Sequence, residues 1–130
     1  SVYVGNFLSG EFGGFGRMNF ANGKKYAGEF KEGIFNGYGV YLFSNGQKYL
    51  GNFVDGEYNG KGTMIFANGA VYTGDFKNSK REGMGTYTLA NGLKYTGEFR
   101  NGVYNGNGVL TMPDGTVKSG VFLNGEYTGK

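Results

Sequence analysis

The residues of this chain that could do acid–base chemistry are its carboxylates. The sequence has no His and no Cys, which removes the commonest general bases, thiol nucleophiles and zinc ligands. Three acids occupy the same position of a 23-residue period: Glu29, Asp75 and Glu98. Paired acids of this kind could hydrolyse a substrate, but an exposed strand gives neither the burial nor the pocket that tunes a pKa. We expect a solvated strand face with salt bridges to Lys31, Lys77 or Arg100, no enzyme activity, no metal and no cofactor.

Composition and charge narrow the class of protein further. Thirteen basic and ten acidic residues in 130 give a net charge of +3, dispersed along the chain, which disfavours nucleic acid as a partner. No apolar run approaches the ~18 residues that indicate a membrane span. Twenty-eight glycines are typical of flexible linkers, but an aromatic content of 18% requires that the rings pack somewhere. We therefore expect a folded chain in which glycines and rings have fixed positions.

An internal repeat of 23 residues organises the sequence. A typical unit has a Tyr, a Gly two residues later, a Phe two residues after that, a third aromatic residue and then a pair of glycines. The first column is Tyr3, Tyr26, Tyr49, Tyr72 and Tyr95, with Lys118 in the sixth position. The units are residues 3–25, 26–48, 49–71, 72–94 and 95–117, with a truncated sixth at 118–130, and we treat residues 1–130 as a single array.

Each unit alternates with a period of two in two segments, which predicts two short strands. Asn-Gly between such segments is a strong hairpin signal. A three-residue loop at Ser44-Asn45-Gly46 sets Tyr41 opposite Tyr49 and puts rings and glycines on one side, and Pro113 suits the same loop. The sequence therefore predicts an all-β, elongated, single-layer antiparallel meander, a plate in which each unit contacts only its neighbours, as in a solenoid.

The columns Y-x-G-x-F-x-x-G-x-[FY]-x-G-x-G-x-Φ-x-Φ-x-N-G resemble the MORN (membrane occupation and recognition nexus) repeat family over essentially the whole chain. The resemblance implies a non-catalytic scaffold or docking module with a protein or peptide partner. It also implies two alternatives: peripheral binding to anionic, phosphoinositide-containing membranes, or a regulatory array of a larger enzyme. The chain departs from many family units in having Phe in place of Trp and in the residue before the paired glycines.

Both faces of the predicted sheet are candidate binding surfaces. The face opposite the rings carries an apolar patch: Val40, Leu42, Leu50, Val54, Ile65 and Val71. The alternative is that these residues simply favour strands. The aromatic face could form a groove with tyrosine hydroxyls at its rim: Tyr26, Tyr49, Tyr72 and Tyr95. The alternative there is a purely structural ladder of rings.

Lysines after the Asn-Gly turns are candidates for contact with anionic lipid: Lys24, Lys25, Lys48 and Lys94. Each basic residue near such a surface is worth about 1 kcal/mol, so the predicted attraction is weak. Val71 and Val117 interrupt the row, and solvated turn lysines are the alternative. Uncapped terminal strands pair with other strand edges, which predicts either a longer protein or a homo-oligomer formed through these edges.

One stretch, "NSKREG" at residues 78–83, departs from the repeat. Ser79 stands where other units have Gly, and a positive φ there would cost about 1 kcal/mol. Arg81 stands where other units have a ring, and we expect its guanidinium to stack on Phe76 or Tyr104. Lys80 and Arg81 then belong to the most strongly charged loop of the array. The stretch is either a looser loop or a contact site.

Overall fold

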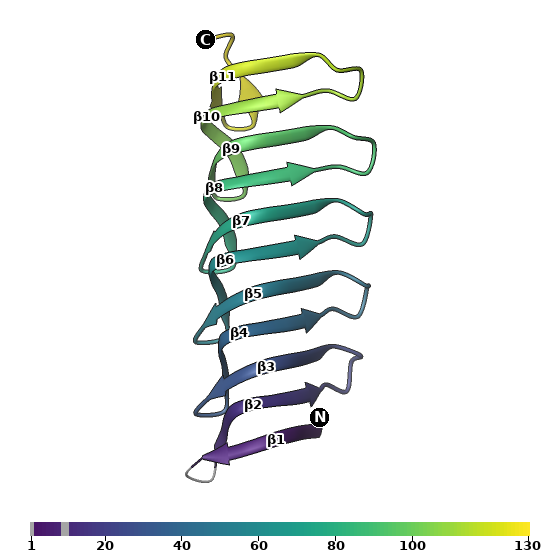
Figure 1. The fold of residues 1–130 in the computed structure, drawn as a ribbon, viewed down its shortest axis with the longest axis vertical. Coiled ribbons are helices and arrows are strands. Elements are labelled where there is room, and N and C mark those ends of the chain that lie inside the picture. The colour runs from purple at the N-terminus through teal and green to yellow at the C-terminus, as the bar shows by residue number, and fades with distance from the viewer. Residues whose placement is uncertain (1, 9–10) are drawn as a thin grey trace.

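The computed structural model describes residues 2–8 and 11–130, with side chains from residue 14 onward, so the side chains of Tyr3, Phe7 and Phe12 lie outside the described residues. Over this part the chain forms one 12-stranded antiparallel sheet in sequence order, and the predicted all-β meander is confirmed. Figure 1 shows the strands stacked along the long axis. They are β1 (Val2–Leu8), β2 (Glu11–Asn19), β3 (Lys25–Lys31), β4 (Ile34–Leu42), β5 (Lys48–Val54), β6 (Glu57–Ile65), β7 (Val71–Lys77), β8 (Lys80–Thr88), β9 (Lys94–Arg100), β10 (Val103–Thr111), β11 (Val117–Leu123) and β12 (Glu126–Tyr127).

The hairpins between successive units have the predicted three-residue loop. Tyr41 lies opposite Tyr49, as that loop requires. The N–H of Phe43 donates to the Gln47 carbonyl at 2.8 Å, and Gly46, with φ of 92°, donates to the Phe43 carbonyl at 3.1 Å. The left-handed φ explains why every such loop ends in glycine. In the loop that contains Pro113, the corresponding bond runs from the Gly115 N–H to the Met112 carbonyl at 2.9 Å.

In units two to five the hairpin within the unit is tighter and has two loop residues. Glu32 and Gly33 both have positive φ, 52° and 80°, which is the type I′ geometry that matches the twist of the flanking strands. In the fourth unit Asn78 and Ser79 take the same conformation at 50° and 65°. Ser79 therefore does have a positive φ, and the departure from glycine leaves the turn type unchanged.

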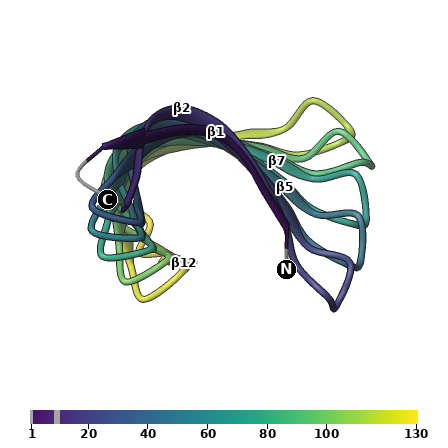
Figure 2. The same ribbon diagram turned by 90° about the horizontal axis from the view of Figure 1, so that it is seen from below.

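The sheet is curved, and the expectation of a plate is wrong. The pairing of β3 with β4 shifts register between Gly28 and Phe30, so Glu29 forms a bulge, and equivalent shifts recur in the other units. A bulge bends its strand and increases the local twist. Viewed along its long axis in Figure 2, the sheet forms an arch that is open on one side.

The core is a ladder of rings over glycines. Tyr49 is 0% exposed, stacks on Tyr58 with ring centroids 4.1 Å apart, and meets Phe53 edge-on at 5.1 Å. A Cβ on Gly62 would lie 2.6 Å from Cε1 of the Tyr49 ring, so only glycine allows this approach. The ladder repeats in the next units and explains how a single-layer sheet buries hydrophobic surface without a covering helix.

Candidate functional site

The aromatic face is the inner side of the arch. Phe35 and Tyr41 both lie on β4, six residues apart, which in a straight strand corresponds to about 20 Å. Their ring centroids are 5.7 Å apart, and Phe20, from the preceding loop, lies 6.1 Å from Phe35. The strand must therefore bend around this face. We call the inner surface the concave groove and the opposite one the convex face.

The tyrosines proposed for the rim of this groove lie beneath its surface, so that prediction is wrong. Tyr26, Tyr49, Tyr72 and Tyr95 are at most 1% exposed. Each hydroxyl donates to the backbone carbonyl three residues later: Tyr26 to Glu29, Tyr49 to Asn52, Tyr72 to Asp75 and Tyr95 to Glu98, at 2.7–2.8 Å. These are the carbonyls at the bulges, and the bend brings them over the ring. The four tyrosines are thus structural and cannot contact a partner directly in this conformation.

Burial raises the pKa of these phenols. The pKa of Tyr72 rises to about 12 because the ring is buried and Asp75 lies nearby, and that of Tyr95 rises to about 12 through burial and the charge of Glu98. The pKa of Tyr58 also rises to about 12, chiefly through burial. None of these groups is poised to give up its proton near neutral pH.

The walls of the concave groove come from residues that the sequence reasoning did not single out. A pocket of about 330 Å³ in units two to five is lined by Phe43, Gln47, Tyr58, Met64, Phe66, Phe76, Ser79, Lys80, Arg81 and Gly102. Phe43 and Phe66 are partly buried members of the hydrophobic cluster. The sequence does contain a pattern that predicts these wall residues. An apolar residue stands two positions before the Asn-Gly or Asp-Gly pair of every full unit, and it recurs at the 23-residue period. The pocket combines aromatic walls with cationic and hydroxyl groups.

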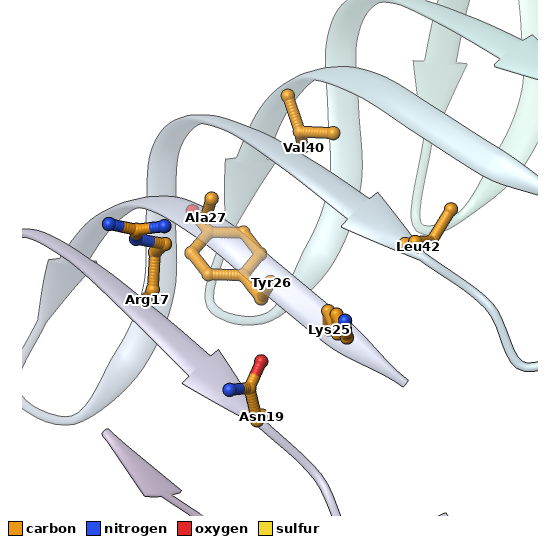
Figure 3. A pocket seen from close by; sticks show the side chains of 7 residues that line it. All are labelled: Arg17, Asn19, Lys25, Tyr26, Ala27, Val40 and Leu42. Atoms are coloured by element: carbon orange, nitrogen blue, oxygen red, sulfur yellow. The ribbon is translucent and has the colours of Figure 1, made fainter. Parts of the chain in front are cut away.

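The apolar patch on the convex face forms only in part. Val40 lies opposite Leu50, as expected, and Ile65 lies opposite Val71. Leu42 lies opposite Lys48 at the loop end of β4. A hollow of about 410 Å³ is lined by Arg17, Asn19, Lys25, Tyr26, Ala27, Val40 and Leu42 (Figure 3).

Val54 does not join this patch. It lies opposite Glu57 at the two-residue turn, four residues along β5 from Leu50, and is 48% exposed. The patch is also limited along the array. Thr63 and Thr73 hydroxyls lie 3.3 Å apart in the row that contains Leu50, so hydroxyls replace the apolar side chains from there on. The convex face therefore offers two small apolar pairs separated by polar residues.

The lysines proposed for lipid contact do not form one row. Lys25, Lys48 and Lys94 begin β3, β5 and β9 at the same end of the sheet and on the convex side. Equivalent residues of successive units are two strands, or about 10 Å, apart. Val71 begins β7 at the place between Lys48 and Lys94, so these two lysines are separated by two units. Lys24 lies in the loop that precedes β3. Membrane contact through these residues stays a prediction.

The recurring carboxylates have a structural partner that differs from the expected one. Glu29 accepts from the Tyr38 N–H at 2.6 Å and Glu98 from the Asn107 N–H at 2.6 Å, across the bulge. Asp75 accepts from the Met84 N–H at 3.1 Å and forms an ion pair with Lys61, not with Lys77. The hydrogen bond from Lys61 is the main reason that the pKa of Asp75 is lowered, with the Met84 N–H assisting.

No group of three or more His, Cys, Asp or Glu gathers into a metal site in the part of the chain that the structure describes. Nor does that part contain a helix long and apolar enough to cross a membrane. The strands at the two ends of the sheet are β1 and β12, and self-association through them stays a prediction that sedimentation of the purified chain checks.

The irregular fourth unit places the guanidinium of Arg81 in the concave groove. The guanidinium carbon of Arg81 lies 4.9 Å from the ring centroid of Tyr87 and 5.8 Å from those of Phe66, Tyr72 and Phe99. The stacking predicted on Phe76 or Tyr104 is wrong, because the bend of β8 brings Tyr87 back over Arg81. Ser79 keeps the turn attached to unit three, since its N–H donates to the Tyr58 carbonyl and its Oγ accepts from the Tyr58 N–H.

Comparison with known proteins agrees with this architecture. Among solved structures, 33 chains are similar. One is the TCP domain of SAS-4 (dCPAP) from Drosophila melanogaster in complex with a proline-rich motif of Ana2 (dSTIL). It has a TM-score of 0.52 and 19% identity, over 81% of this chain and 57% of that one. The likeness shows the fold alone, and this chain spans little more than half the length of that one.

No curated protein sequence matches the chain. A family model described as "MORN repeat" matches residues 3–25, 26–48, 49–71, 72–94 and 95–117. These consecutive segments cover nearly all of the chain and coincide with the ring-over-glycine units of the sheet. The chain therefore belongs to the MORN repeat family.

Proposed function

We propose that this chain is a non-catalytic docking module that holds a segment of a partner protein in its concave groove. The observation that carries the proposal is the shape of the aromatic face: the bend of each long strand turns a ladder of rings into a groove with partly exposed aromatic walls. Binding sites for peptides and small ligands are commonly concave, mostly apolar and fitted with a few polar groups. The pocket between Phe43 and Arg81 has that composition.

The convex face supports the proposal less well as a docking surface. Its apolar pairs, Val40 with Leu50 and Ile65 with Val71, are small and separated by Lys48 and by threonines. The solved TCP domain of SAS-4 (dCPAP) was obtained in complex with a proline-rich motif of another protein, so a sheet of this fold can present a surface to a peptide. That similarity supports a peptide partner and does not identify it.

A displayed library of random peptides tests the proposal. The purified array is used to select binders, and each binder is then titrated against wild type, Phe43→Ser on the groove wall and Leu50→Ser on the convex face. We expect Phe43→Ser to weaken binding about tenfold or more and Leu50→Ser to leave it unchanged, with circular dichroism showing that both variants keep the fold. Binders lost with Leu50→Ser and kept with Phe43→Ser place docking on the convex face.

Anionic membrane binding is the second candidate, favoured by the common side of Lys25, Lys48 and Lys94. The separation of these lysines limits it to a weak, salt-sensitive attraction. Co-sedimentation with vesicles containing phosphoinositide, at low and high salt, tests it. The absence of binding at low salt removes this candidate and leaves the docking proposal untouched.

A further inference from the structure

The fourth unit carries a cation where the other described units carry a ring. In units two, three and five the ring in this column stacks on the core tyrosine, with centroids 4.0 Å apart for Tyr26 and Phe35 and 3.9 Å apart for Tyr95 and Tyr104. In the fourth unit the corresponding partner of Tyr72 is Arg81. Its guanidinium occupies the space of a ring, among four aromatic side chains, on the wall of the concave groove.

This guanidinium has no counter-ion among the described residues. Its Nη1 is buried and has no hydrogen-bond partner. The nearby carboxylates are engaged elsewhere: Glu82 accepts from the Asn101 N–H at 2.9 Å, and Asp75 is paired with Lys61. A buried charge is costly unless it is paired and hydrogen-bonded, and contacts with aromatic rings offset only part of that cost. The fold thus keeps an unsatisfied positive charge at this position.

The surroundings of Arg81 leave room for a ligand to supply the missing charge. The pocket of about 330 Å³ that Arg81 lines also contains Ser79 and Lys80. Gly102 lines the same pocket, and a Cβ there would lie only 3.5 Å from Nη2 of Arg81, so glycine at this position places no side chain against this nitrogen. Lys80 lies opposite Lys77 across the turn, which adds to the positive potential at this end.

The other walls of the pocket are apolar and include Met64 and Phe66. A matching ligand therefore has one negative group beside a hydrophobic one. We propose that the pocket formed by Arg81, Lys80, Met64 and Phe66 binds a carboxylate next to an apolar side chain, as supplied by an Asp or Glu residue in an otherwise apolar segment of a partner protein. This inference rests on the proposed function, because it names the chemistry that the concave groove selects. Arg suits the role, since its planar fork can donate two hydrogen bonds to one carboxylate.

A pair of small probes tests the carboxylate directly, without a known partner. In NMR titrations of the full chain we compare 3-phenylpropionate with its neutral amide, 3-phenylpropanamide. We expect the acid to bind about tenfold more tightly than the amide, which is the size of one charge-assisted hydrogen bond. We also expect it to shift the Nε–H resonance of Arg81, with binding that weakens as salt is raised.

Arg81→Tyr is the informative variant, because it restores the ring of the other units, and we therefore expect it to keep the fold. The matched control is Lys118→Tyr, which makes the same exchange of a cation for a ring in another column, outside the pocket. We expect Arg81→Tyr to abolish the preference for acid over amide and Lys118→Tyr to preserve it.

Equal binding of acid and amide, a preference that survives Arg81→Tyr, or no shift of pocket resonances by either probe would each overturn the inference. A stronger response to inorganic phosphate than to 3-phenylpropionate would also overturn it, by assigning the site to phosphate. Failure here is distinguishable from failure of the docking proposal: library peptides that need Phe43 and lack any enrichment in Asp or Glu would keep the groove and remove the carboxylate.

Discussion

The ring-over-glycine ladder makes a sharp prediction about the substitution Gly62→Ala. The φ of Gly62 is not in the left-handed region, so the backbone itself accepts alanine. The added Cβ would lie 2.6 Å from Cε1 and 2.7 Å from Cζ of Tyr49, about 1 Å closer than the usual contact between carbon atoms. Tyr58 stacks on this ring at 4.1 Å and Phe76 meets it at 5.1 Å, so the ring cannot move without disturbing both.

The expected loss of stability combines two terms. Overpacking a tight core typically costs about 1–3 kcal/mol. Displacing the ring also breaks the hydrogen bond from the Tyr49 hydroxyl to the Asn52 carbonyl, 2.8 Å long, which is worth about 1 kcal/mol. We therefore expect Gly62→Ala to lower the free energy of unfolding by about 2–4 kcal/mol. Equilibrium unfolding in urea, followed by circular dichroism, measures this difference.

Gly46→Ala is the control that separates crowding from backbone strain. Gly46 has a φ of 92° and nothing within 4 Å of an added Cβ, so alanine there suffers only the left-handed conformation, about 1–2 kcal/mol. Replacing glycine by alanine also lowers the conformational entropy of the unfolded chain, which stabilises the fold. This effect is the same in both variants, so it cancels when their free energies of unfolding are compared. If Gly62→Ala destabilises the chain less than Gly46→Ala, the reasoning about rings over glycines is refuted. In a Tyr49→Ala background the cost of Gly62→Ala should largely disappear.

Three further predictions follow from the irregular unit and the buried phenols. Arg81→Tyr should raise the free energy of unfolding by about 1–2 kcal/mol, because the new ring can stack on Tyr72 and a guanidinium with an unpaired buried nitrogen is removed. A lower free energy of unfolding in urea would contradict this prediction. Ser79→Gly should change the free energy of unfolding by no more than about 0.5 kcal/mol, because two effects oppose each other. Glycine removes the backbone strain at a φ of 65°, but the hydrogen bond from the Tyr58 N–H to the Ser79 Oγ is lost. A destabilisation of about 2 kcal/mol or more would show that the hydrogen bond dominates. Finally, the pKa of Tyr72 and that of Tyr95 are about 12 in the folded chain, compared with 10.0 for an exposed tyrosine. The unfolded chain therefore loses these two protons at a lower pH than the folded chain does. The contribution of both phenols to the free energy of unfolding should be complete below pH 10 and should be lost between pH 10 and 12. Absorbance of the phenolate checks this, and ionisation of all eleven tyrosines near pH 10 with the fold intact would contradict it.

The strand order and the loop register could be predicted from the sequence because both are local. Asn45-Gly46 fixes a loop type, the loop type fixes which residues face each other, and the repeat copies the result along the chain. The ring-over-glycine packing followed from that register alone. These are the parts of the fold for which one unit contains all the information.

The curvature, and with it the site, could not be predicted in the same way. The bulge at Glu29 is a mismatch of one residue between two strands. Gly28 precedes it, and a glycine inside a strand can mark a bulge, but each unit has so many glycines that this one does not stand out in advance. Without the bend, Tyr26 appears to reach a rim, and Arg81 appears to stack on Phe76, its partner across the strand pair. With the bend, the Tyr26 hydroxyl is covered by the Glu29 carbonyl, and Arg81 meets Tyr87 from the other end of its own strand.

The position of Arg81 also bears on how a repetitive groove could bind a partner in one register. Units of the array repeat about every 10 Å, two strands at a time, so an apolar segment could settle at several equivalent places. A single cation in one unit would favour one of them, since specificity requires a difference between alternatives.

Exchanging the two side chains tests this argument, with Tyr58→Arg and Arg81→Tyr combined in one chain. Tyr58 is the residue equivalent to Arg81 in the preceding unit, and both occupy the ring column beside a core tyrosine. If the cation in this column sets the register, the resonances shifted by 3-phenylpropionate should move from the surroundings of Arg81 to those of residue 58, and Phe43 should respond more than Phe66. If the double variant shows no preference for acid over amide, the cation alone does not define the site. In that case the neighbouring Ser79 and Lys80, which only the fourth unit supplies, are required as well.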